Sequence, residues 1–284
     1  MNHEDKYIVS NNHNHIWLLS ISALLIAFNW HYASYSSTYL LFWCAALSIA
    51  WKKKEDLELN SSLFATIIGL ILISWMLFRG AVSEFSSNDL ITRFYPLISI
   101  AGICLLASKV KNVFQYWREI IIVSLTGIPW EYLFDLMPIT EQIIAIDAKI
   151  SRLMLWYVGF DVHQVGDLVI LPSGSIRIMD ACSSFSLLGL MWQSCLVAFL
   201  YFAIAKNHKL ILGLSSTLIA FVVNGVRLCL LALLVANKQD EAFEYWHGAG
   251  GAEVFTTIAI LLLGGVYWIL TRDKETSLDV TASS

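Results

Sequence analysis

The chain has 284 residues, of which 57% are hydrophobic and 14% are charged. A soluble domain carries nearly twice this share of charged residues, and no polar stretch here is long enough to form one. The formal net charge of -4, without a basic tail, argues against a nucleic-acid partner. Several apolar runs approach or exceed the about 18 residues that cross a bilayer, so we expect a polytopic membrane protein.

The sequence begins with a polar stretch, residues 1–15, that holds a single lysine. It lacks the positively charged start of a signal peptide, so we expect a cytoplasmic tail. Its three histidines have no neighbours that complete a ligand set, and we expect no metal there. One polytopic membrane domain follows at 16–271, and 272–284 are expected to form a second cytoplasmic tail.

Eight apolar segments predict eight membrane helices. They are 16–33, 37–51, 62–79, 91–108, 118–137, 183–205, 209–236 and 252–271. Lysines and arginines concentrate in "WKKKED", "SKVKNVFQYWRE", "AKNHK" and "TRDKE", which all fall on one side of these helices. The positive-inside rule makes this side the cytoplasm, so the segment 138–181 and the loop 237–251 are expected outside.

The segment 138–181 is the only substantial stretch between predicted spans. Its first part has apolar residues at a helical spacing interrupted by charges, which is typical of a helix lying in the membrane interface. These apolar positions are Ile143, Ile146, Ile150, Leu153 and Tyr157. The following "FDVHQVGDLVILPSGSIRIMD" alternates around a Pro-Ser-Gly turn and predicts a short β-hairpin. The expected fold is therefore an all-α integral membrane protein with a small extracytoplasmic cap of one helix and one β-hairpin.

Only one of the five cysteines, Cys182 in "RIMDACSSFSLLGL", lies at a border between polar and apolar sequence. The odd count and wide spacing argue against a disulfide framework, and a thiol inside an apolar run behaves as a small hydrophobe. We expect Cys182 in the first turn of the helix at 183–205, where backbone N–H groups favour a thiolate. Asp180 and Ser183 are candidate caps of that helix. The alternative is an ordinary small residue at a helix start.

A second unusual residue is Arg227, in "AFVVNGVRLCLLALL". A guanidinium in an apolar helix is costly and marks either a functional site or a buried partner. It lies about 27 Å along the helix from Lys209, at 1.5 Å per residue, and hence near the expected level of Cys182. The alternative is an arginine that extends to the membrane surface.

A third candidate is His247, in "EYWHGAGGAEVF" at the outer end of the last predicted helix. Gly248, Gly250 and Gly251 would let the backbone pack closely around it. An isolated histidine at an interface is usually incidental. A thiol, an imidazole and a fixed cation on one side of the membrane are, however, the groups that acyl transfer through a cysteine requires.

These residues resemble the motifs of the exosortase/archaeosortase family. "DACSS" before one helix, "NGVR" inside the next and "HGAGG" before the last are similar to the family's Cys, Asn-x-x-Arg and His-x-x-x-Gly motifs. The lead-in "LPSGSIRIMDACS" is also similar, and the resemblance covers a core of about 90–271. Two positions depart from the pattern: Ser184 stands where glycine is usual, and Asp180 where glutamate is common.

The resemblance implies a multi-pass transpeptidase-like cysteine enzyme of the bacterial inner membrane, with its active site facing the exterior. Its partners would be membrane-anchored proteins with a C-terminal sorting signal of the PEP-CTERM type, which combines a short motif, a membrane helix and a basic cluster. It implies Cys182, Arg227 and His247 as catalytic residues, with Asn224 and Gly251 as further motif positions. No cofactor is implied.

Two acids in "GIPWEYLFDLM" are further candidates. Glu131 and Asp135 are four residues apart and share one face near the outer end of the helix at 118–137. They would pair with Arg227 or receive a polar motif of the substrate. The alternative is two acids at a wet membrane interface.

Two other classes of function remain open at the level of sequence. In a transporter, Arg227, Glu131 and Asp135 would line a polar path through the membrane. In a membrane acyltransferase, His247 would act without Cys182. Replacing the thiol separates them, because only a cysteine enzyme would lose its activity.

Overall fold

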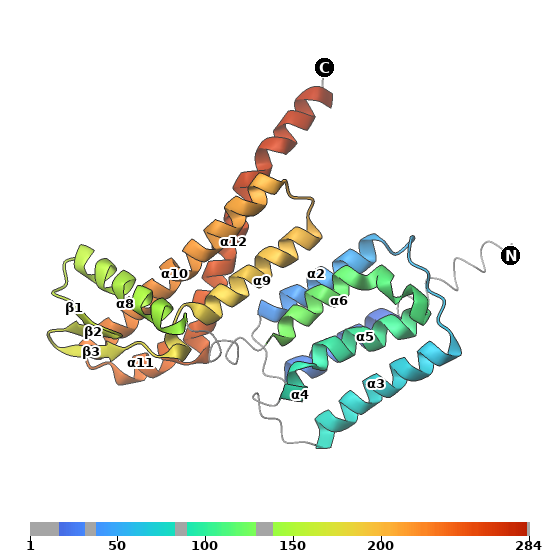
Figure 1. Ribbon diagram of the computed structural model, residues 1–284, viewed down its shortest axis with the longest axis horizontal. Helices are drawn as coiled ribbons and strands as arrows, with labels where there is room; N and C mark the ends of the chain where they lie inside the picture. The colour runs from blue at the N-terminus through green and yellow to red at the C-terminus, as the bar shows by residue number, and fades with distance from the viewer. Residues whose placement is uncertain (1–16, 32–37, 83–89, 129–138, 283–284) are drawn as a thin grey trace. The chain divides into compact units, whose positions relative to one another are not determined.

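The computed structural model describes residues 17–31, 38–82, 90–128 and 139–282 (Figure 1). The chain divides into two compact units, Met1–Ile128 and Pro129–Ser284. Helices dominate both units, and the described strands all belong to the second.

Apolar helices build the first unit. They are Trp17–His31, α2 (Thr38–Lys52), α3 (Leu63–Val82), α4 (Leu90–Arg93), α5 (Tyr95–Ala107) and α6 (Trp117–Ser124), with 3-10 turns η1 (Val110–Tyr116) and η2 (Leu125–Gly127). α3 packs along α5, and α2 along α6. Inside this unit Asn29 donates to the hydroxyl of Ser99 at 3.0 Å, so its buried amide is bonded across two helices.

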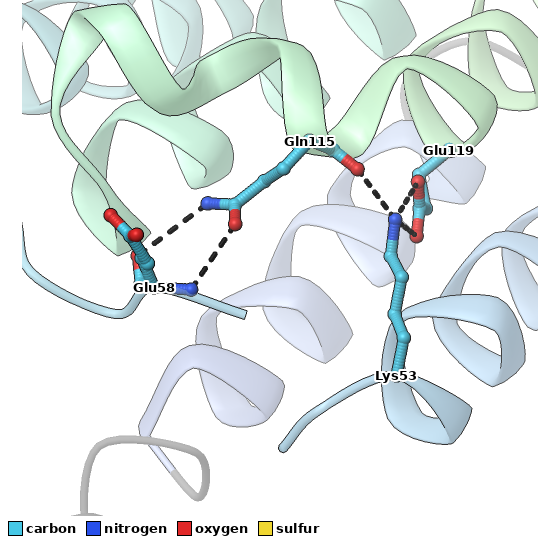
Figure 2. Close-up of polar contacts among 4 residues, drawn as sticks. All are labelled: Lys53, Glu58, Gln115 and Glu119. Carbon is cyan, nitrogen blue, oxygen red and sulfur yellow. Dashed lines mark hydrogen bonds and ion pairs between the residues drawn. The ribbon is translucent and has the colours of Figure 1, made fainter. Parts of the chain in front are cut away.

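A buried ion pair connects the end of α2 to α6 in this unit (Figure 2). The Lys53 ammonium lies 2.8 Å from Oε1 of Glu119 and donates to Oε2 at 3.0 Å. It also donates to the carbonyl of Gln115 at 2.6 Å. The Gln115 side chain in turn accepts from the backbone N–H of Glu58 at 3.1 Å. The basic "WKKKED" stretch is thereby tied to the segment that begins α6.

The second unit surrounds one long helix. Its elements are α8 (Thr140–Tyr157), β1 (His163–Val165), β2 (Leu168–Leu171), β3 (Gly174–Arg177), η3 (Asp180–Cys182), α9 (Phe185–Tyr201), α10 (Lys206–Ala236), α11 (Asp240–His247) and α12 (Ala249–Ala282). α10 packs against α8, α9, α11 and α12 and also contacts β3. It contributes to both hydrophobic clusters of the unit, one with α9 and α12 and the other with α8 and the strands.

The strands form a three-stranded antiparallel sheet in the order β1-β2-β3 (Figure 1). One hairpin was expected, and β2 and β3 form it around Pro172 and Ser173. β1 adds a third strand through a second turn, in which Gly166 adopts a φ of 61° that favours glycine. Val169 and Ile176 are buried and face the second cluster, so the sheet is held against α8 and α10.

The helix α8 buries mainly small and polar residues against the rest of the unit. Ile146, Leu153 and Tyr157 are exposed, whereas the buried positions are Ile143, Asp147, Ala148, Ser151 and Leu155. Gly225 of α10 permits close packing of the two helices, because a Cβ at this position would lie 2.8 Å from the side chain of Ile150. The placement of α8 in the membrane interface stays a prediction, and its exposed apolar side chains are available for contact with lipid.

Three described helices are long and apolar enough to cross a membrane: Leu63–Val82, Lys206–Ala236 and Ala249–Arg272. Four shorter apolar helices correspond to other predicted spans: Trp17–His31, Leu40–Lys52, Tyr95–Ala107 and Phe185–Tyr201. The predicted span at 118–137 extends beyond the described residues, and α6 ends within it at Ser124. The count of eight spans stays a prediction.

Candidate active site

Cys182 ends a single 3-10 turn that precedes α9. Its backbone N–H donates to the carbonyl of Met179 at 2.9 Å, and the next residue, Ser183, is extended with φ -71° and ψ 161°. α9 begins only at Phe185, with Ser184 as its N-cap residue. The expectation that Cys182 lies in the first turn of this helix is therefore wrong. An extended residue separates the thiol from the aligned N–H groups, whose effect is confined to the helix terminus.

His247 is the last residue of α11, and its Nε2 lies 3.1 Å from the Sγ of Cys182. The ring stacks on Phe243, one turn earlier in the same helix, with centroids 5.2 Å apart and an interplanar angle of 9°. This stacking holds the imidazole in the orientation that meets the thiol. A proton can therefore pass directly between the sulfur and the ring nitrogen.

Gly251 allows the sharp connection that follows His247. A Cβ at this position would lie 2.4 Å from the Cα and 2.5 Å from the carbonyl oxygen of Trp246, so no other residue fits. A Cβ on Gly250 would meet only the ring of Tyr245, at an ordinary 3.5 Å. The expectation of close backbone packing thus holds at Gly251, which fits the spacing of the His-x-x-x-Gly motif.

Arg227 is a buried residue of α10 that reaches the end of α11. Its guanidinium donates to the carbonyl of His247 at 2.8 Å. Its Nε has no hydrogen-bond partner among the described residues. The side chain therefore contacts the protein rather than extending to a surface, and one of its buried donors is unused in this part of the chain.

The charge of Arg227 also acts on the thiol. Burial raises the pKa of Cys182, and the positive charge of Arg227 opposes this rise. Because burial is the larger effect, the resting thiol keeps its proton more firmly than an exposed cysteine does. Formation of a thiolate at this site therefore depends on transfer of the proton to His247.

Asn224 precedes Arg227 by almost one turn of α10, so both side chains project from the same face. Its amide donates to the carbonyl of Cys182 at 3.1 Å. The Asn-x-x-Arg motif thus contacts both partners of the site: Asn224 holds the turn with the thiol, and Arg227 holds the end of the helix with His247. Two residues of one rigid helix set the distance between sulfur and imidazole.

Asp147 is a residue of the site that sequence reasoning missed. It is fully buried in α8, and its carboxylate accepts the backbone N–H of Ser184 at 2.7 Å as well as the hydroxyl of the same residue. Burial raises the pKa of Asp147 to about 6, while hydrogen bonds from Ser184 and Asn224 act in the opposite direction. A carboxylate from another helix therefore caps the start of α9, next to the turn that carries Cys182.

One feature of the sequence could have identified Asp147 as buried: it shares a helical face with Ile143, Ala148 and Ser151. A lone acid among small and apolar residues is rarely buried without a partner. The same contact explains the departure at Ser184, because a glycine there would lack the hydroxyl that Asp147 binds.

Four candidates from the sequence remain: Asp180, Ser183, Glu131 and Asp135. Asp180 is exposed and its carboxylate does not cap α9, although its carbonyl accepts the hydroxyl of Ser183 at 2.8 Å. Ser183 Oγ lies 3.5 Å from the N–H of Phe185, a long contact at the start of α9. Glu131 and Asp135 lie outside the described residues. Within the described part of the chain, no three His, Cys, Asp or Glu side chains are grouped to hold a metal ion.

The fold and site define a helical membrane protein with a buried thiol, a contacting imidazole and an adjacent cation. A sequence model of the family described as "Transmembrane exosortase" matches residues 30–264, and the chain belongs to this family. Cys182, His247 and Arg227 all lie in the matched region.

Among curated proteins, the chain is 26% identical over 126 residues to a probable archaeosortase E of Methanocaldococcus jannaschii. This match covers 44% of the chain and spans 65% of the length of that relative. No solved structure is significantly similar to the chain.

Proposed function

We propose that this protein is a membrane cysteine peptidase or transpeptidase that cleaves C-terminal sorting signals of exported proteins. Membership of the transmembrane exosortase family supports a role in protein sorting. The observation that carries the chemistry is the 3.1 Å contact between the Sγ of Cys182 and the Nε2 of His247, beside the buried Arg227. The signal is proposed to be of the PEP-CTERM type, and the site to face the exterior of a bacterial inner membrane.

The first half of the reaction forms a thioester. His247 takes the proton of Cys182, and the thiolate attacks the carbonyl carbon of the substrate peptide bond. The guanidinium of Arg227, with its unused Nε donor, stabilises the oxyanion of the tetrahedral intermediate. The intermediate collapses when the C–N bond breaks and His247 returns the proton to the departing amine, which remains on the membrane helix of the sorting signal.

The second half releases the sorted protein. An amine, a hydroxyl or water attacks the thioester carbonyl, His247 accepts its proton, and the sulfur of Cys182 leaves as a thiolate. Attack by water gives hydrolysis, whereas an amine or hydroxyl gives transfer to an acceptor. The predicted topology supports cleavage at the outer boundary of the membrane, where a membrane-anchored substrate leaves the lipid.

The test replaces the thiol. Cys182→Ala and Cys182→Ser are co-expressed with a tagged protein that ends in a short polar motif, an apolar helix and an arginine cluster, and its size is followed on a gel. Full-length substrate is expected to accumulate in both variants, because serine fills nearly the same volume but lacks thiolate character. Cys195→Ala is the matched control, since it removes another buried thiol of this unit outside the site.

Two results would contradict the proposal. Shortening of the substrate by Cys182→Ala at the wild-type rate would reduce the cysteine to a structural residue. It would also favour an acyltransferase that depends on His247 alone, because such an enzyme does not need the thiol. The second result is a substrate that stays at full length with wild type, which would favour a transporter, because a transporter cleaves no peptide bond.

A further inference from the structure

The strand β3 is an edge of the sheet that runs directly toward Cys182. Among the described strands β3 pairs with β2 alone, and four residues, 178–181, separate its end from the thiol. Ile176 and Ile178 belong to the same hydrophobic cluster as Cys182. The edge and the thiol are therefore parts of one packed structure. A chain aligned with the edge would end close to the site, because four residues join β3 to Cys182.

The backbone of β3 has hydrogen-bonding groups that β2 does not use. The N–H of Ile178 donates to the carbonyl of Asp167 at 3.0 Å, and inward and outward groups alternate along an antiparallel strand. Ser175 and Arg177 consequently direct their N–H and C=O groups away from β2. No described residue bonds to these outward groups, and both side chains are exposed.

An unpaired edge of this kind is a template for another strand. Addition of an extended peptide satisfies the free groups through its main chain, and each added residue advances about 3.3 Å along the strand. The four residues after β3 span at most about 14 Å when extended. A peptide paired with β3 therefore needs only a few more residues to place a carbonyl at Cys182 and Arg227.

We propose that the substrate segment next to its membrane helix adds to β3 as a fourth, extended strand, and that this pairing brings the scissile bond to Cys182. The proposal rests on the proposed function and specifies how its substrate is held. The bound group is an extended polypeptide with free main-chain N–H and C=O groups at alternate positions. Recognition through the main chain requires an extended conformation of the segment and sets few requirements on the identity of its side chains.

Ser175→Pro tests the pairing, because it removes one outward N–H and leaves the hydrogen bonds to β2 in place. The matched control is Gln164→Pro on β1. The alternation of the ladder also turns the N–H of Gln164 away from β2, but at the opposite edge of the sheet. With the tagged substrate, Ser175→Pro in the full-length enzyme is expected to slow shortening at least tenfold, and Gln164→Pro to remain within about twofold of wild type.

A crosslinking experiment tests the geometry without depending on the proline variant. Ser175→Cys is introduced with Cys182→Ala, so that uncleaved substrate stays bound, and single cysteines are placed at successive positions of the substrate segment. Strand addition predicts disulfide formation at alternate positions, because side chains of a strand alternate between two faces.

The outcomes separate the two proposals. If wild type leaves the substrate at full length, the proposed function itself fails. If wild type shortens the substrate and Ser175→Pro does so equally well, only the strand addition fails. Crosslinks without alternation, or crosslinks to a second copy of the enzyme instead of the substrate, would also overturn it.

Discussion

Each unit of the protein buries a charged side chain, but the two charges differ in the partner that they contact. In the first unit Glu119 is 2% exposed, and the ammonium of Lys53 lies 2.8 Å from its carboxylate (Figure 2). In the second unit Arg227 is 9% exposed and donates to a carbonyl, while its Nε lacks a partner among the described residues.

The difference supports the proposed role of Arg227 in the reaction. A buried charge is costly, and a carboxylate with its own ammonium has that cost offset inside the protein. A guanidinium bonded to a neutral carbonyl keeps its positive charge available to an anion, which here would be the oxyanion of the reaction. The first arrangement holds the protein together, and the second is suited to catalysis.

The largest expected effect comes from changing the shape of Arg227, whose guanidinium has no ion-pair partner among the described residues. Arg227→Lys keeps the charge but loses the planar fork that reaches His247 and the substrate together, so we expect processing to fall by about 100-fold. Lys53→Arg, which also keeps its charge, is the matched control and should process substrate normally. The measurement is substrate shortening at equal expression. Near-normal processing by Arg227→Lys would make Arg227 a structural residue.

A smaller effect is expected from breaking the paired charge. Lys53→Met leaves the carboxylate of Glu119 buried without its cation. The free energy of unfolding should fall by on the order of 2–3 kcal/mol, less than for a fully buried pair because the Lys53 side chain is 26% exposed. The loss is measured as a lower Tm in detergent. The double variant Lys53→Met, Glu119→Leu should recover most of it, and a double variant as unstable as the single one would contradict this interpretation.

The last prediction concerns the pH dependence of stability that comes from Asp147, whose pKa is raised from 3.8 to about 6. Because the folded state binds this proton more tightly than the unfolded state, the stabilising contribution is complete below about pH 4 and is lost as pH rises through about 6. Asparagine does not titrate. The Tm of wild type relative to Asp147→Asn should therefore fall between pH 4 and 7, by the equivalent of about 2–3 kcal/mol. Plots of Tm against pH that run parallel for wild type and Asp147→Asn would contradict this prediction.

The sequence by itself was enough to assign the class and the family. Composition and the length of apolar runs are local properties, and they indicate a membrane protein without reference to packing. The motifs around Cys182, Arg227 and His247 are short, and their order along the chain identified the exosortase/archaeosortase family, which the match over 30–264 confirms. Asn224 and Arg227 are three residues apart in a helix, so their common face also followed from spacing alone.

Only the tertiary structure decided how these residues meet. Cys182 and His247 are 65 residues apart, and Asp147 and Ser184 are 37 apart, so no local pattern records either contact. Two contacts depend on the tertiary structure: the carboxylate of Asp147 at the start of α9, and the amide of Asn224 on the turn that holds the thiol. Each is stabilised by groups from distant segments, whose burial together outweighs the preference of any one segment alone.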